Sequence, residues 1–103
     1  MITEVYLPNN IDGNLNKIRS LVKRKILNTF DRFKERIRMI KVTFSDENGP
    51  KGGQDTRCSI HILSDSGDLL TSHKDSNPGK AVSLTIKKAR QSLIESIRRK
   101  RGR

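Results

Sequence analysis

Two segments of this chain repeat apolar residues every three or four positions, and the stretch between them repeats apolar residues every second position. The first stripe is formed by Leu15, Ile18, Val22, Ile26, Phe30, Phe33 and Ile37, and the second by Val82, Ile86, Ala89, Leu93 and Ile97. A spacing of three and four residues is typical of an amphipathic helix with one buried face. The sequence therefore predicts two helices that each need an apolar surface to cover.

The ends of both predicted helices carry recognisable signals. Asn14 is a suitable N-cap for the first helix, which we expect to end near Phe33 or Lys34. Asn77 can cap the second helix, and Pro78 suits its first turn.

The middle of the chain predicts strands. Residues 40–44 and 58–62 alternate apolar and polar side chains, which is typical of strands with one buried face. Residues 64–67, Ser-Asp-Ser-Gly, are a turn signal that lets residues 68–74 return antiparallel to the second of these strands. A short opening strand at residues 3–7 completes the set.

The predicted order is therefore β-α-β-β-β-α, an α+β fold. Only one face of the sheet alternates apolar, so we expect both helices to pack on that face. A four-stranded sheet with two helices on one face is similar to a double-stranded-RNA-binding domain. The outer surfaces of the two helices would then lie side by side.

Positive charge is concentrated in the two predicted helices. The 103 residues carry a formal net charge of +11, from 22 Lys and Arg against 11 Asp and Glu. Residues 15–38 have a net charge of +7 and residues 78–103 of +8, whereas the rest of the chain has −4. Such an excess favours a polyanionic partner, nucleic acid before an anionic membrane surface.

Length and composition set further limits. A chain of 103 residues suits one domain, which we expect over residues 1–97, with a frayed basic tail over residues 98–103. No apolar run approaches the roughly 20 residues that span a bilayer, and the N-terminus does not have the pattern of a signal peptide. We therefore expect a cytoplasmic protein with no membrane partner. Cys58 is the only cysteine, which excludes an intrachain disulfide or a CxxC metal site.

The basic helices predict a phosphate-binding surface. A solvated helix face usually mixes both signs of charge, but acidic residues are scarce here, which leaves like charges at i,i+4 uncompensated. When several cations contact a polyanion, counterions are released, and the binding depends strongly on salt. The candidate residues on the polar faces are Lys23, Arg24, Lys34, Lys87, Lys88, Arg98 and Arg99.

The aromatic residues argue against recognition of base identity. The chain has four, Tyr6, Phe30, Phe33 and Phe44, and three of them fit core stripes. Sequence-specific single-strand binders usually offer several exposed rings for stacking. If RNA is the partner, we expect shape and backbone contacts to dominate.

Three other features support weaker hypotheses. Residues 49–53, GPKGG, could hold a phosphate in backbone N–H groups, but they lack the GxxxxGK[ST] pattern and better fit a flexible hairpin loop.

His61 and His73 could approach each other in antiparallel strands, yet two histidines are a poor zinc site. Cys58 shares the parity of its apolar neighbours, so a core residue is favoured over a reactive thiol. We expect no catalytic residue, no metal and no cofactor.

A distinctive phrase, FSDENGPKGGQDTRC, spans residues 44–58, and two asparagines at 9–10 follow the first predicted strand. The second helix adds Ala81-Val82, Lys88 and Ser92-Leu93. Together with the β-α-β-β-β-α order, these residues resemble the ribosome hibernation-promoting factor family, which includes the ribosome-associated translation inhibitors. The likeness covers nearly the whole chain.

The resemblance implies a non-enzymatic domain that binds rRNA of the small ribosomal subunit, in the channel used by mRNA and by A- and P-site tRNAs. Members block translation during stationary phase or stress. The family's basic position midway along helix one falls near Lys25, and its recurrent lysine in helix two falls on Lys88. Many members have an arginine where Gln91 stands, and Arg90 is adjacent. This chain resembles the short form, which would need a second factor to pair ribosomes or would not pair them at all.

Two other functions stay open at this point. The basic face could bind an acidic protein, as in a regulator of the sigma factor modulation type. A small nuclease that uses His61 and His73 as acid and base is a third alternative.

Overall fold

The structure, a computed structural model, describes residues 1–7, 15–48 and 54–101. Its elements are β1 (Ile2–Tyr6), α1 (Leu15–Phe30), the 3₁₀ turn η1 (Asp31–Phe33), β2 (Ile37–Asn48), β3 (Gln54–Ser64), β4 (Gly67–Asp75) and α2 (Pro78–Arg101). The predicted β-α-β-β-β-α order is confirmed. The expected cap Asn14 and the glycine-rich residues 49–53 lie outside the described residues.

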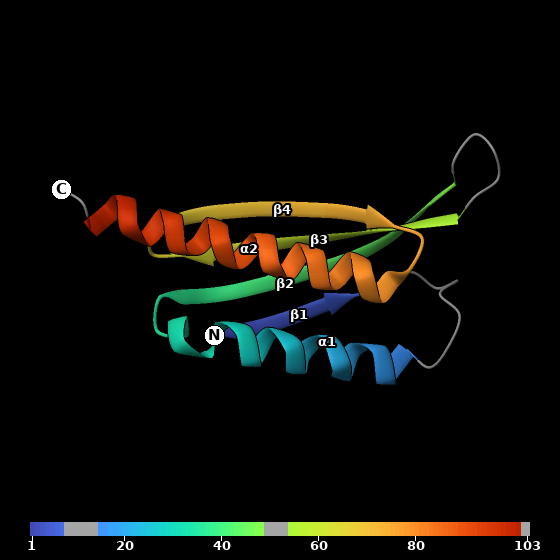
Figure 1. Ribbon diagram of the computed structural model, residues 1–103. Coiled ribbons are helices and arrows are strands. Elements are labelled where there is room, and N and C mark those ends of the chain that lie inside the picture. Colours follow the sequence, from blue (N-terminus) through green and yellow to red (C-terminus); the bar gives the residue numbers. More distant parts are fainter. Residues whose placement is uncertain (8–14, 49–53, 102–103) are drawn as a thin grey trace.

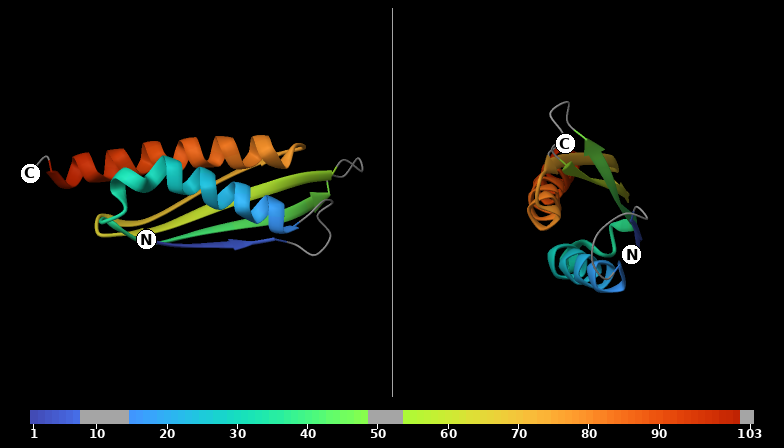
Figure 2. Two further views of the ribbon diagram at one scale, coloured as in Figure 1. Left: turned by 90° about the horizontal axis from the view of Figure 1, so that it is seen from below. Right: turned by 90° about the vertical axis from the view of Figure 1, so that its right-hand side faces the viewer.

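The four strands form one sheet in the order β1-β2-β3-β4 (Figure 1). β1 pairs with β2 in parallel, and the connection between them contains α1. β2, β3 and β4 form an antiparallel meander. Both helices cover the same face of this sheet (Figure 2), as predicted.

The core lies between that face and the two helices. Phe30 of α1, Ile60 of β3 and Leu93 of α2 are completely buried. Removing a large apolar side chain from water stabilises the fold by about 1.5–3 kcal/mol. The buried apolar residues are Val5, Val22, Ile26, Phe30, Ile37, Ile40, Val42, Phe44, Cys58, Ile60, Ile62, Ala81, Val82, Ile86, Ala89, Leu93 and Ile97.

The register of β2 shifts at its first residues, and this shift decides the fate of Ile37. Ile37 pairs with Ser64 and Met39 with Leu63, so Arg38 is an extra residue in β2. The irregularity turns Ile37 into the core, where it is 3% exposed, while Arg38 is exposed. Ile37 thus continues the apolar stripe of the first predicted helix, but it does so from a strand.

The turn between β3 and β4 has the predicted sequence and a specific glycine requirement. Gly67 has φ +121°, a conformation that residues with a Cβ rarely adopt. The Ser64 hydroxyl donates to the Gly67 carbonyl at 2.8 Å and accepts from the Ser66 amide at 3.2 Å. The Ser96 hydroxyl of α2 donates to the Ser66 carbonyl at 3.2 Å, which ties this turn to the helix.

The N-terminus of α2 is capped as predicted. The Asn77 side-chain oxygen accepts from the backbone N–H of Gly79 at 2.8 Å and of Lys80 at 3.3 Å. Farther along the helix, the hydroxyl of buried Thr85 lies 2.6 Å from the Ala81 carbonyl and 3.3 Å from the Cys58 carbonyl. The second contact fixes the helix against β3.

The C-terminal end of α2 differs from the expected frayed tail. The helix continues through Arg101, so residues 98–101 are helical. Ile97 is 8% exposed and belongs to the core, so its packing supports the turn that follows. α2 extends past the end of the sheet (Figures 1 and 2).

We expect Asn77→Ala to lower the free energy of unfolding by about 1 kcal/mol, because two backbone N–H groups lose their acceptor. Urea denaturation followed by circular dichroism measures this change. Ser76→Ala, which alters the exposed neighbouring residue, is the control and should change stability by less than about 0.5 kcal/mol. Equal effects of the two substitutions would contradict the assigned cap.

Candidate nucleic-acid interface

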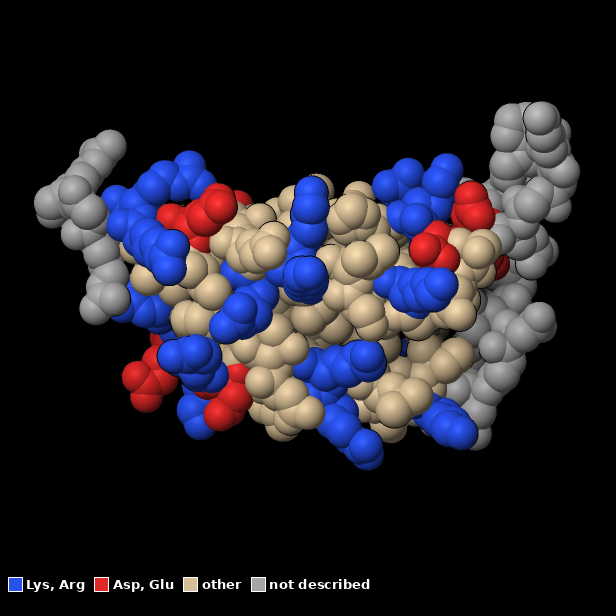
Figure 3. Space-filling view, viewed as in Figure 1, with Lys and Arg blue, Asp and Glu red and all other residues tan. Residues whose placement is uncertain are grey.

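The two helices carry exposed cations on the side away from the sheet. α1 contains no acidic residue, and α2 contains only Glu95. Figure 3 shows Lys and Arg side chains distributed over this face, which we call the helix face. Of the residues predicted from the sequence, Arg90 is half-buried, and the exposed ones are Lys23, Arg24, Lys25, Lys34, Lys87, Lys88, Arg98 and Arg99.

The helices contact each other where Lys25 of α1 meets the first turns of α2. The Lys25 ammonium donates to the Ser83 hydroxyl at 3.2 Å. A depression lined by Lys25, Asn28, Thr29, Ser83 and Ile86 lies at this contact, and its volume is about 240 Å³. From there the helices spread apart toward the C-terminal end of α2 (Figure 1).

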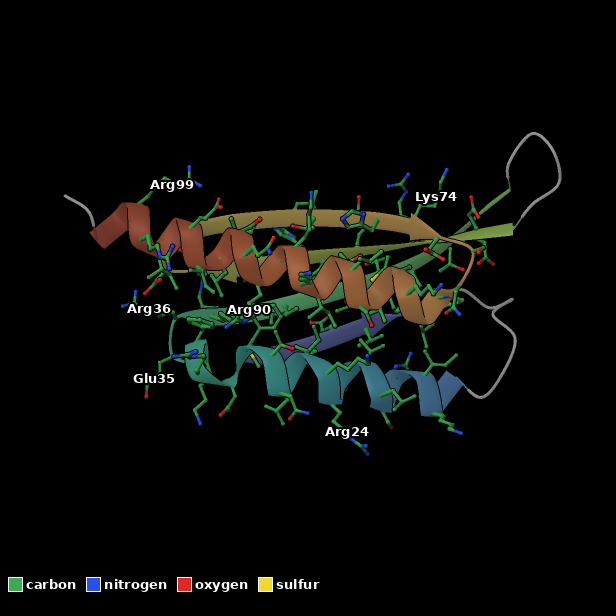
Figure 4. All side chains as sticks on the ribbon, viewed as in Figure 1. Arg24, Glu35, Arg36, Lys74, Arg90 and Arg99 are labelled. Carbon is green, nitrogen blue, oxygen red and sulfur yellow. The ribbon has the colours of Figure 1, made fainter. Side chains whose placement is uncertain are left out.

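Three of the predicted cations converge on the space between the helices. Arg90 points from α2 toward α1 in Figure 4. Ser83, Lys87 and Arg90 are spaced by four and three residues, so they share one side of α2. Since Ser83 contacts Lys25, this side faces α1. Lys25, Lys87 and Arg90 therefore form the centre of the helix face.

Other predicted cations lie on the outer flanks. Arg24 points away from α2, and Arg99 points away from α1 (Figure 4). Lys88 is three helical turns before Arg99 and shares its side of α2. The predicted set is thus one broad basic face with a central row and two flanks.

The first helix ends at Phe30, earlier than expected, so Lys34 lies after η1 and not on the polar face of α1. This segment is less strongly basic than its sequence indicates. The Lys34 ammonium lies 3.7 Å from the Asp31 carboxylate, and the Arg36 guanidinium lies 3.7 Å from the Asp65 carboxylate. Exposed pairs of this kind contribute little to stability, but they lower the net charge available to a ligand.

Sequence reasoning missed two residues that the structure places beside Lys25. Lys80 and Ser83 are exposed and line, with Lys25, a second shallow depression at the start of α2. Their spacing of three, with Lys87 four residues later, was the available signal. Only the packing of α2 against α1 identifies this side as the one that faces Lys25.

The opposite face of the sheet is uncovered and of mixed charge. Tyr6, 48% exposed, lies there, and its hydroxyl donates to the Glu4 carboxylate, which raises the pKa of Tyr6. Lys41 pairs in register with Glu4 and His61. Phe30 and Phe44 are buried, so the described part of the helix face presents no set of stacking rings.

The hypothesis that the two histidines act as a pair is wrong. His73 pairs with Cys58 and His61 with Leu70. Cross-strand partners point to the same side of a sheet, and side chains alternate along each strand. His73 therefore lies on the helix-covered side with Cys58, and His61 lies on the uncovered side, 4.0 Å from the Asp68 carboxylate.

No group of three or more His, Cys, Asp or Glu side chains within residues 1–7, 15–48 and 54–101 could hold a metal ion. No helix in this part of the chain is long and apolar enough to cross a membrane.

Comparison with known proteins bears on the fold. A scan against protein-family models matched none, and a search of curated proteins found no match. Among solved structures, a ribosomal subunit interface protein from Coxiella burnetii aligns with a TM-score of 0.72 at 14% identity, over 92% of this chain and 96% of that one. The N-terminal domain of Thermus thermophilus Protein Y aligns with a TM-score of 0.68 at 20% identity, over 89% and 93%.

This chain has the fold of these two proteins. The α+β architecture expected from the sequence pattern is confirmed by that likeness. At these identities the likeness concerns the fold, and the basic helix face is a property of this chain's own residues.

We expect Cys58 to react with iodoacetamide only at strongly alkaline pH in the folded protein. The thiol is buried under α2, and burial raises its pKa to about 11, although the Thr85 hydroxyl opposes this shift. Alkylation measured by mass spectrometry between pH 7 and 11 should give a lower apparent pKa and much faster reaction in urea. Equal rates in folded and unfolded protein would contradict the burial.

Proposed function

We propose that this chain binds the ribosome through its helix face and thereby prevents translation. Its contacts would be with rRNA of the small subunit, in the decoding channel, where the bound domain would exclude mRNA and tRNA. The observation that carries this proposal is the gathering of cations from two helices on one side of the sheet. The fold shared with a ribosomal subunit interface protein and with Protein Y supports it.

The chemistry of the helix face suits a ribose-phosphate backbone. Lysine and arginine side chains bind phosphates without regard to base sequence. The 24 residues of α2 extend about 36 Å, long enough to follow several successive phosphates. The mixed charge of the uncovered sheet face provides no comparable site.

The mechanism is steric and electrostatic, and no covalent bond changes. Translating ribosomes hold mRNA and tRNA in the same channel, so the inhibitor would bind ribosomes that are idle. Such ribosomes would be those of cells in stationary phase or under stress, and binding would take place in the cytoplasm. Pairing of ribosomes would depend on a second factor.

A regulator that binds an acidic protein, of the sigma factor modulation type, is the alternative that uses the same face. A pull-down from lysate with and without nuclease separates the two functions. Loss of the partner after RNA removal favours the ribosome, and retention of the partner favours the acidic protein.

We expect ribosome binding to weaken steeply with salt. If about six phosphates are contacted, the logarithm of the affinity should fall with the logarithm of salt concentration at a slope of roughly −4 to −5. Co-sedimentation with purified small subunits between low and moderate salt measures the slope. A slope near zero would remove the electrostatic mechanism.

We expect Lys87→Gln to weaken binding to small subunits and to reduce the magnitude of the salt slope by about 1, because one phosphate contact is lost. Lys41→Gln removes the same charge from the uncovered sheet face and is the matched control. Its affinity and slope should equal those of the wild type. Identical losses in both variants would show that net charge, and not the helix face, determines binding.

A further inference from the structure

An apolar hollow opens between α1 and the first turns of α2. Its walls are Ile18, Leu21 and Val22 of α1, Phe44 of β2, and Pro78 and Val82 of α2. The hollow has a volume of about 150 Å³, and its surface is almost wholly apolar. It lies beside the Lys25–Ser83 contact, at one end of the helix face.

Two lysines lie in or next to this hollow. Lys25 lines the hollow and also the adjoining depression, which it shares with Lys80 and Ser83. No acidic side chain lines either depression among the described residues. The site therefore combines an apolar interior with positive charge at its edge.

We propose that the hollow receives one unpaired nucleobase of the RNA bound to the helix face, whose phosphate lies against Lys25 and Lys80. This inference rests on the proposed function. An unpaired nucleobase is a flat ring with apolar faces joined to an anionic backbone, which matches the two parts of the site. Proteins that take a base out of its stack commonly hold it in a pocket between apolar and aromatic side chains.

The size of the hollow favours a base over an acidic peptide. An amphipathic peptide binds through several anchors along a groove. This hollow is bounded by two helices and by Phe44, and its volume of about 150 Å³ accommodates a single ring. Its apolar walls offer almost no hydrogen bonds to base edges, so any unpaired base should bind, with little preference for sequence.

The chain offers a matched pair of substitutions. Leu21, 45% exposed, lines the hollow, whereas Leu27, 53% exposed on the same helix, does not. Leu21→Ser and Leu27→Ser each remove one half-exposed apolar side chain without changing charge. Neither leucine belongs to the buried core, so both variants should fold.

The test uses a short RNA duplex with one central unpaired (bulged) nucleotide, either intact or abasic, titrated by fluorescence anisotropy. We expect wild-type protein to bind the intact RNA at least about fivefold more tightly than the abasic RNA. Leu21→Ser should bring this ratio of affinities close to one, and Leu27→Ser should leave it unchanged. 2-Aminopurine at the central position should report an environment change that Leu21→Ser removes.

The outcomes separate this inference from the proposed function. If Leu21→Ser and Leu27→Ser give the same ratio of affinities for intact and abasic RNA, and the steep salt slope is retained, the base site is overturned and phosphate binding is left intact. Absence of salt-dependent RNA binding in the wild type would overturn both. If Leu21→Ser weakens binding to whole ribosomes but not to the RNA, the hollow contacts a ribosomal protein and the inference fails.

Discussion

Burial of two apolar stripes against a single sheet face is the constraint on which this structure depends. The buried apolar residues of the strands all lie on one face of the sheet, whereas the other face carries polar and charged side chains with a few exposed apolar ones such as Ile2 and Leu70, so α1 and α2 share the first face. Once Phe30 and Leu93 are both buried there, the polar sides of both helices must point the same way. The common basic face is therefore a geometric consequence of core packing. Its charge density arises because neither helix has enough acidic residues to compensate its cations.

This arrangement places like charges close together, which costs stability. Within α2, Lys87 lies two turns or less from both Lys80 and Arg90. Lys25 of α1 lies close to the same side of α2, where it contacts Ser83. Repulsion of this kind weakens an isolated helix. Compensation comes from the interior, where the Thr85 hydroxyl and the apolar stripe hold α2 on β3. A surface that repels itself when empty is stabilised when a polyanion covers it, which fits the proposed role.

The periodicity of the sequence was sufficient to predict both helices, and local residue types were sufficient to predict the turn at residues 64–67 and the capping role of Asn77. It could not predict features that depend on register. The extra residue Arg38 moves Ile37 from a helical stripe into a strand, and hydrophobic spacing alone cannot distinguish these cases. Strand register likewise decided that His61 and His73 lie on opposite faces.

The candidate site was predictable as charge but not as shape. Basic positions were readable from the sequence, whereas their division into a central row and two flanks depends on how each helix is rotated about its axis. The meeting of Lys25 with Ser83 joins residues 58 positions apart, and no local pattern encodes it. The apolar hollow next to it depends on the packing of three separate elements and is a property of the folded chain only.

The overhang of α2 beyond the sheet has a consequence for the energetics of association. Arg98 and Arg99 belong to the last turn of α2, and the buried Ile97 directly before them packs in the core. A disordered arm with the same cations would lose conformational freedom when it reached its target, at about 1–2 kcal/mol for each residue immobilised. A rigid projection is already arranged before the encounter, so more of its attraction survives as affinity.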